Sequence, residues 1–307
     1  MDAPQDELTP LFYDTIRRFL EQEVAPHYEA WEAVGEVPRS LWHKLGEAGL
    51  LGIDLPETLG GSGADFASVP LALEEISRQG FGGLASAYNI HANIVMPYLL
   101  HIGTSDQRQR WLPAMARGEA IGAIAMTEPG AGSDLAAMQT RATRTASGWR
   151  LDGSKLFITH GQVADLVIVC AKSDPAAGAR GVSLFLVDTT LPGFSRGQPI
   201  KKIGQHASDT AELFFDGIEL GEDALLGEAG SGFAYLMQEL PRERLGVAAQ
   251  ALGAMEGALA LTLDYVRERR AFGRAVGDFQ NTRFTLAEVR AQIDMGRAYF
   301  EQCVARY

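Results

Sequence analysis

Cysteine is scarce in this 307-residue chain, which contains only Cys170 and Cys303. They lie far apart in the sequence, so they provide neither a disulfide framework nor the closely spaced pairs that bind zinc. The sequence also has no cluster of His, Cys, Asp and Glu with metal-site spacing, no GxSxG nucleophile motif and no phosphate-binding P-loop. It therefore carries no sequence sign of a metalloenzyme, a serine hydrolase or a P-loop nucleotidase.

The chain also lacks an excess of basic residues, because its formal net charge is -12. Nucleic acids and anionic membranes attract basic surfaces, so we expect neither as a partner. No run of about 18 apolar residues occurs that would span a membrane. The start, MDAPQDELTP, lacks the basic and apolar regions of a signal peptide. We predict a soluble cytoplasmic protein in which an anionic ligand needs a local basic patch.

The hydrophobic pattern changes twice along the chain. Residues 1–119 show apolar residues at helical spacing, Pro- and Gly-rich joints, and an expected N-cap at Thr104. Residues 120–226 contain short β-rich runs such as DLVIVCAK, GVSLFLVD and AELFFDGIEL. Residues 227–307 return to helical stretches, expected at 233–239, 243–270 and 280–306. The pattern predicts an α+β protein with helical, β and helical domains in that order.

Two short segments carry the strongest functional signal: MTEPGAGSD at residues 126–134 and LFITHG at residues 156–161. Small and turn-forming residues in the first segment bring backbone N–H groups close to a ligand. In the second, strand alternation is expected to place Phe157 and Thr159 on one face. Each segment alone is equally typical of an ordinary turn or strand. Their order and spacing suggest a site for a flat ligand, a flavin.

With further blocks, these segments resemble the acyl-CoA dehydrogenase family of flavoenzymes from about Leu11 to the last residue. The segment GFAYLMQELPRERL at residues 232–245 is most similar to the long-chain and isovaleryl types. The resemblance implies a β-barrel or sandwich in the middle and a C-terminal four-helix bundle, whose last helices we expect to be absent. The other matching blocks are GEVPRSLWHKLGEAGLLGIDLPETLGGSGAD (35–65), GTSDQRQRWLP (103–113), SDTAELFFDGIEL (208–220) and RERRAFGRAVGDFQ (267–280).

Dehydrogenation of an acyl thioester requires a base for the α-proton and an acceptor for the β-hydride. Burial beside apolar groups raises the pKa of a carboxyl, which suits proton abstraction at neutral pH. Glu243 follows Pro241 at an expected first helical turn and precedes apolar residues. The helix dipole alone would also explain an acid at that place. The resemblance implies that Glu243 is the catalytic base.

The resemblance implies FAD as the cofactor, with the first loop along the isoalloxazine ring and ribityl chain. Thr127 would hydrogen-bond the ring, and Phe157, Ile158 and Thr159 would cover its other side. The family often has Trp in place of Phe157 and an aromatic in place of Ile124, which implies a smaller wall here. The loop contacts implied are Ile124, Ala125, Met126, Thr127, Glu128, Pro129, Gly130, Ala131, Gly132 and Ser133.

The implied substrate contacts lie around the proposed base. Pro241 and Arg242 would flank the acyl chain, and Ser133 would lie near the substrate as well as the flavin. Arg244 would support the site, although an exposed Arg more often pairs with a surface carboxylate. The substrate contacts implied are Ser133, Pro241, Arg242, Glu243 and Arg244.

Arg269, Phe272 and Gln280 match positions that reach the flavin of a neighbouring subunit. Taken alone, the RERR run would be a solvated basic helix end. The interval from Arg269 to Gln280 agrees with the family and implies a homodimer or homotetramer. His91 lies in an apolar stretch and is predicted to be a satisfied core or pocket-lining histidine without a catalytic role.

The resemblance implies FAD-dependent α,β-dehydrogenation of fatty or branched acyl-CoA thioesters to 2-enoyl-CoA, as in fatty acid β-oxidation. An electron-transfer flavoprotein would accept the electrons. Two alternatives stay open: a flavin oxidase or monooxygenase on the same scaffold, and a non-catalytic acyl-CoA-binding protein. The sequence does not determine the length or branching of the acyl group.

Overall fold

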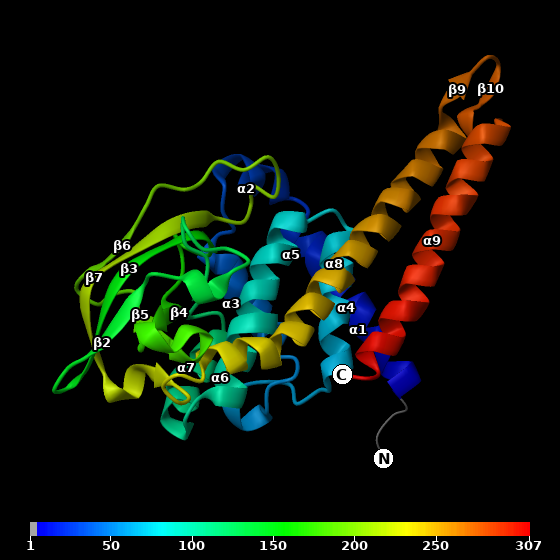
Figure 1. Ribbon diagram of the computed structural model, residues 1–307. Coiled ribbons are helices and arrows are strands. Elements are labelled where there is room, and N and C mark those ends of the chain that lie inside the picture. Colours follow the sequence, from blue (N-terminus) through cyan, green and yellow to red (C-terminus); the bar gives the residue numbers. More distant parts are fainter. Residues whose placement is uncertain (1–4) are drawn as a thin grey trace.

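The computed structural model describes residues 5–307, with side chains described from residue 12 (Figure 1). Residues 1–4, the first part of the segment MDAPQDELTP, lie outside the described residues. The fold class is confirmed: helices come first, a mixed sheet follows, and long helices end the described chain. The first helices are α1 (Gln5–Phe19), α2 (Tyr28–Val34), α3 (Arg39–Glu47), α4 (Val69–Arg78), α5 (Gly82–Tyr88), α6 (Met96–Ile102) and α7 (Ser105–Ala116).

A capping box starts α7. The Thr104 hydroxyl accepts a hydrogen bond from the Gln107 backbone N–H at 3.2 Å, and the Gln107 side chain accepts from the Thr104 N–H at 2.9 Å. The predicted N-cap is confirmed. π-helical turns at Leu20–Val24 and Asn89–Val95 extend α1 and join α5 to α6.

The middle of the chain forms one sheet in the order β6-β7-β3-β2-β4-β5-β8, and β1 pairs in parallel with β4. The three predicted β-rich runs correspond to β4, β5 and β7. The strands are β1 (Gly122–Ala125), β2 (Arg141–Arg144), β3 (Gly148–Thr159), β4 (Leu166–Lys172), β5 (Val182–Asp188), β6 (Phe194–Arg196), β7 (Thr210–Gly221) and β8 (Leu225–Leu226).

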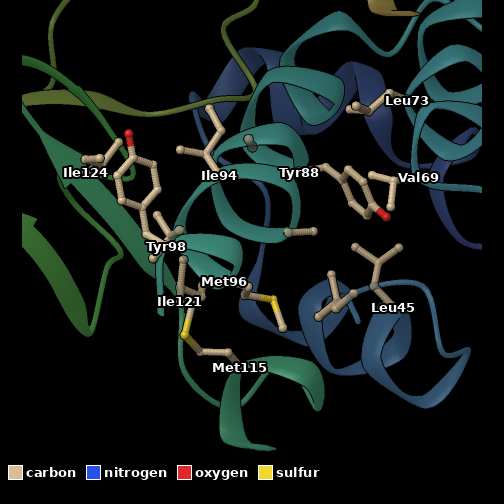
Figure 2. Close-up of a cluster of buried hydrophobic side chains, with 14 of the residues drawn as sticks. Leu45, Val69, Leu73, Tyr88, Ile94, Met96, Tyr98, Met115, Ile121 and Ile124 are labelled. Atoms are coloured by element: carbon tan, nitrogen blue, oxygen red, sulfur yellow. The ribbon is translucent and has the colours of Figure 1, made fainter. Parts of the chain in front are cut away.

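The strand β4 is buried on both faces. Ile168 and Cys170 belong to the core shared with the N-terminal helices, while Val167 and Val169 belong to a second core inside the β-rich part. Successive side chains of a strand point to opposite faces, which explains the division. Figure 2 shows part of the first core, where helical residues such as Tyr88 and Met96 and β1 residue Ile124 lie in one cluster.

The C-terminal part is a hairpin of two long helices, α8 (Gly232–Glu268) and α9 (Gln280–Val304), joined through the short strands β9 (Arg270–Ala271) and β10 (Arg274–Ala275). Figure 1 shows that its tip extends away from the rest of the molecule. The predicted helix at 280–306 is confirmed as α9, which ends two residues earlier, at Val304. The predicted break between 239 and 243 is wrong, because α8 continues through Pro241.

Helix α8 is long and apolar enough to span a membrane by length and composition. Within this fold α8 packs directly on another helix, because its glycines lie against the backbone of α4. A Cβ on Gly253 would lie 2.1 Å from the Glu74 carbonyl oxygen, and one on Gly257 would lie 2.0 Å from that of Arg78. Only glycine permits so close an approach.

Candidate active site

The two segments singled out in the sequence lie side by side. The Leu156 backbone N–H donates to the Thr127 carbonyl oxygen at 2.8 Å, and the Lys155 ammonium donates to the Met126 carbonyl oxygen at 2.9 Å. The loop after β1 is therefore fastened to β3. This contact joins parts of the chain about thirty residues apart and makes one surface of the two segments.

A buried ion pair holds the loop from below. Lys155 is fully buried, and its ammonium lies 2.8 Å from Oε1 of Glu128. The Glu128 carboxylate also accepts hydrogen bonds from the backbone N–H groups of Gln139 and Thr140, at 2.5 and 2.9 Å. Burial alone would raise the pKa of Glu128, but the bonds from Lys155, Thr140 and Gln139 lower it overall. The Glu128 side chain thus supports the loop from inside.

The outer face of the loop is open. Pro129, Gly130, Gly132 and Ser133 are exposed, and a Cβ on either glycine would meet nothing within 4 Å. Thr127 is half-buried. By contrast, other predicted flavin contacts have buried side chains that pack into the protein. These are Ile124, Ala125, Ala131 and Ile158.

The strand β3 is irregular at Phe157. A register shift against β7 lies between Lys155 and Ile158, and Phe157 has a φ of 61° in the left-handed region. Phe157 is therefore turned out of the strand pattern and is 61% exposed, while Thr159 is half-buried. A strained, exposed aromatic side chain beside an open loop is a common feature of binding sites.

Glu243 receives a hydrogen bond from a residue that the sequence prediction missed. The Tyr98 hydroxyl, on α6, donates to Oε1 of Glu243, on α8, at 2.9 Å. Burial raises the pKa of Glu243; the Tyr98 hydrogen bond opposes the increase, Glu239 adds to it, and Arg244 opposes it. One oxygen of the half-buried carboxyl is therefore held by Tyr98, and among the described residues no hydrogen bond is made to the other.

The thiol of Cys170, on β4, is buried and is affected by charged groups of both parts of the candidate site. Burial raises the pKa of the Cys170 thiol to about 12; Lys155 opposes the increase, while Glu243 and Glu128 add to it.

The residues flanking Glu243 have different surroundings. Arg242 is buried and points elsewhere: it donates to Asp54 at 2.6 Å and to the Asn93 carbonyl oxygen at 3.0 Å. Pro241 and Arg244 are exposed. Pro241 also lies in the interior of α8, so the expectation of a first helical turn is wrong. The helix dipole consequently offers no alternative explanation for Glu243.

Three predicted flavin contacts lie at the hairpin tip. Arg269, Phe272 and Gln280 are exposed, and Phe272 is 96% exposed with a φ of 53°. The helical path from Glu243 to Arg269 is about 39 Å at about 1.5 Å per residue. These residues and Glu243 therefore do not converge within one chain.

His91 is a buried residue with its hydrogen bonds satisfied. Its Nε2 lies 3.1 Å from the Met115 carbonyl oxygen, and the Gly122 N–H donates to Nδ1 at 3.1 Å. Burial, with a contribution from His160, lowers the pKa of His91 to about 3. His91 is a core histidine, as predicted. Among residues 5–307, no group of three or more His, Cys, Asp or Glu is arranged to hold a metal ion.

Three family models match the chain in order: the acyl-CoA dehydrogenase N-terminal domain over residues 7–119, the middle domain over 123–218 and the C-terminal domain over 230–307. The chain belongs to the acyl-CoA dehydrogenase family. It is therefore an oxidoreductase of a flavoprotein family, as its sequence motifs indicated.

Individual members of the acyl-CoA dehydrogenase family are similar over nearly the whole chain. The long-chain specific acyl-CoA dehydrogenase, mitochondrial, of Rattus norvegicus is 46% identical over 296 residues, which is 96% of this chain and 68% of that protein. The isovaleryl-CoA dehydrogenase, mitochondrial, of Solanum tuberosum is 36% identical over 296 residues, 96% of this chain and 72% of that protein. The crystal structure of acyl-CoA dehydrogenase from Geobacillus kaustophilus has a TM-score of 0.94 and 44% identity, covering 99% of this chain and 79% of that one.

Proposed function

We propose that the chain catalyses FAD-dependent α,β-dehydrogenation of acyl-CoA thioesters to 2-enoyl-CoA, with Glu243 as the base. The observation that carries this proposal is the Tyr98–Glu243 hydrogen bond on a carboxyl whose pKa burial raises. An acid in this setting is a suitable general base near neutral pH. Family membership supplies the substrate class.

Each residue at the base has a distinct task. The Tyr98 hydroxyl holds Oε1 of Glu243 and fixes the orientation of the carboxyl group, so Oε2 accepts the α-proton of the substrate. Tyr98 is 1% exposed, and its packing in the core keeps the hydroxyl in place. Arg244, which favours the ionised form of Glu243, helps to keep the base ready.

The residues of the loop and β3 fit a flavin. Exposed glycines leave room for a flat ring, and the exposed Phe157 offers an aromatic wall beside Thr127 and Thr159. When bound, FAD would supply the hydride acceptor. The Glu128–Lys155 pair would keep the loop in its open-faced conformation. Ser133 would lie near the substrate as well as the flavin.

The positions of Arg269, Phe272 and Gln280 support a site completed by a second subunit. They are exposed at the tip of an arm that extends away from its own base. We therefore propose a homodimer or homotetramer in which this tip contacts the FAD of a neighbour. An electron-transfer flavoprotein is the proposed electron acceptor, and the cytoplasm stays a prediction.

The test is anaerobic titration of the FAD-loaded protein with acyl-CoA thioesters of different lengths, for the wild type and Glu243→Gln. We expect the flavin absorbance to bleach in the wild type, and about 100-fold or more slowly in Glu243→Gln. The exposed Glu268→Gln on the same helix is the matched control. Equal bleaching in Glu243→Gln would contradict the assignment of the base. Rapid reoxidation in air would indicate an oxidase, and acyl-CoA binding by a flavin-free protein would indicate a binding function.

A further inference from the structure

A second buried acid lies next to Glu243 on α8. Glu239 is four residues earlier, so the two carboxyl groups occupy the same side of the helix. Glu239 is 2% exposed, and among the described residues its Oε2 has no hydrogen-bond partner. A buried carboxyl oxygen without a partner is costly, and such groups usually have a functional reason. Substrate deprotonation by Glu243 alone does not require Glu239.

The other oxygen of Glu239 contacts a residue at the protein surface. Its Oε1 lies 2.9 Å from Nδ1 of His101, and the His101 side chain is 36% exposed whereas that of Glu239 is 3% exposed. His101 is three residues after Tyr98 on α6. Helices α6 and α8 are therefore joined by two polar contacts one turn apart, Tyr98 with Glu243 and His101 with Glu239. The second contact includes a side chain, that of His101, which is exposed to solvent.

Every turnover leaves a proton on Glu243, and this proton has to depart before the base can act again. Tyr98 offers no exit, because burial and the Glu243 carboxylate raise the pKa of its hydroxyl. The cation Arg242, also on this part of α8, is held by Asp54. Glu239 lies one helical turn from Glu243, and its hydrogen bond to His101 connects it to a side chain that is 36% exposed.

We propose that Glu239 and His101 conduct the proton from Glu243 to solvent, an inference that rests on the proposed role of Glu243. In the starting state Glu239 carries a proton on Oε1 and donates it to Nδ1 of neutral His101, which is protonated at Nε2. The O–H bond of protonated Glu243 breaks as an O–H bond forms at Oε2 of Glu239. The Oε1–H bond of Glu239 breaks as an N–H bond forms at Nδ1, and the Nε2–H bond of His101 breaks as water takes that proton. Rotation of the Glu239 carboxyl and exchange of the His101 tautomer through water restore the starting state. No electrons are transferred in these steps.

Isotope exchange tests the route separately from hydride transfer. A β-thia acyl-CoA has an acidic α-proton but no hydride to give at the sulfur position. The FAD-loaded protein in D₂O should exchange this proton for deuterium, which NMR measures. Exchange needs both abstraction by Glu243 and passage of that proton to solvent. A change in the long-wavelength flavin absorbance on binding reports abstraction alone.

We expect Glu239→Gln and His101→Gln to slow exchange at least about tenfold while the absorbance change persists. A glutamine at either position keeps a hydrogen bond but cannot pass a proton. The exposed His43→Gln on α3 is the matched control and should exchange at the wild-type rate.

The outcomes separate the two proposals. Wild-type exchange in both Glu239→Gln and His101→Gln would overturn the route and leave Glu243 as the base. Exchange and an absorbance change that persist in Glu243→Gln would overturn the proposed function itself. Should circular dichroism show that Glu239→Gln does not fold, His101→Gln decides the question, because its side chain lies at the surface.

Discussion

Tyr98 and Glu243 are 145 residues apart in the sequence, yet the Tyr98 hydroxyl donates to the Glu243 carboxylate at 2.9 Å. One residue belongs to the N-terminal helices and the other to the hairpin helix α8. The orientation and the pKa of Glu243 therefore depend on how these two parts pack together.

The first prediction concerns pH. Ionised Glu243 is the form that accepts a proton, and the Tyr98 hydrogen bond favours this form. In Tyr98→Phe the pKa of Glu243, already raised by burial, should rise further, so the acidic limb of kcat/KM should move to higher pH. The rate well above this limb should change less. The exposed Tyr299→Phe is the control, and an unmoved limb in Tyr98→Phe would contradict the assignment.

The second prediction concerns the ion pair below the loop. Lys155→Met leaves the Glu128 carboxylate buried without its cation and should lower the free energy of unfolding by about 3–5 kcal/mol. Urea denaturation measures this change, and flavin content after gel filtration reports the loop. The double variant Lys155→Met with Glu128→Gln should recover part of the stability. No recovery would mean that charge is not the reason for the loss.

Acidification should weaken the same pair. The hydrogen bonds from Lys155, Thr140 and Gln139 hold the folded-state pKa of Glu128 below its unfolded value. The stability that Glu128 contributes is therefore present above the unfolded pKa and is lost as pH falls through the folded pKa. Urea midpoints measured across the acid range should differ least between wild type and Lys155→Met at the lowest pH.

The third prediction concerns helix packing. In Gly257→Ala the new Cβ would meet the Arg78 carbonyl oxygen of α4 at 2.0 Å, so α8 has to move and the loss should be about 1–3 kcal/mol. Gly296→Ala on α9 is the matched control, because its Cβ would have an ordinary 3.5 Å contact with Leu252. It should stabilise by about 0.5–1 kcal/mol through helix propensity. Equal urea midpoints for the two variants would contradict the close approach.

The fourth prediction concerns subunit assembly. Glu243→Gln and Arg269→Ala should each be inactive alone. If a site takes Glu243 from one chain and Arg269 from another, unfolding and refolding the two variants together should restore about a quarter of the wild-type activity, because half of the dimers are mixed and each has one intact site. A double variant that carries both substitutions in the same chain, refolded alone, should show no recovery of activity. A mixture that stays inactive would show that the arm does not complete a neighbour's site.

Much of the fold could be predicted because local signals and burial agree. The runs that became β4 and β5 are almost continuously apolar, as expected for strands buried on both faces. The path of α8 through Pro241 could not be predicted. A proline inside a helix costs about 3 kcal/mol, which favours a break in the sequence-based prediction. The packing of the glycine-bearing face of α8 on α4 is a tertiary contact that the sequence does not display.

The site was predictable only in part, for a similar reason. The loop residues and Glu243 stand in short sequence segments that can be recognised from adjacent residues. Tyr98, in contrast, meets Glu243 through a contact that only the tertiary structure creates. The outward turn of Phe157 depends on a register shift between β3 and β7, which simple alternation does not reveal. No sequence pattern indicates a role for Lys155, because its burial against Glu128 arises only in the tertiary structure.

The distance between the hairpin tip and the base carried by the same helix has a consequence for handling the protein. An arm that completes a neighbour's site couples cofactor retention to assembly through mass action. Dilution below the dissociation constant of the subunits should then release flavin from chains that remain folded, and added flavin should draw monomers back together. Apparent specific activity should accordingly fall with dilution, with no change in the chemistry at Glu243.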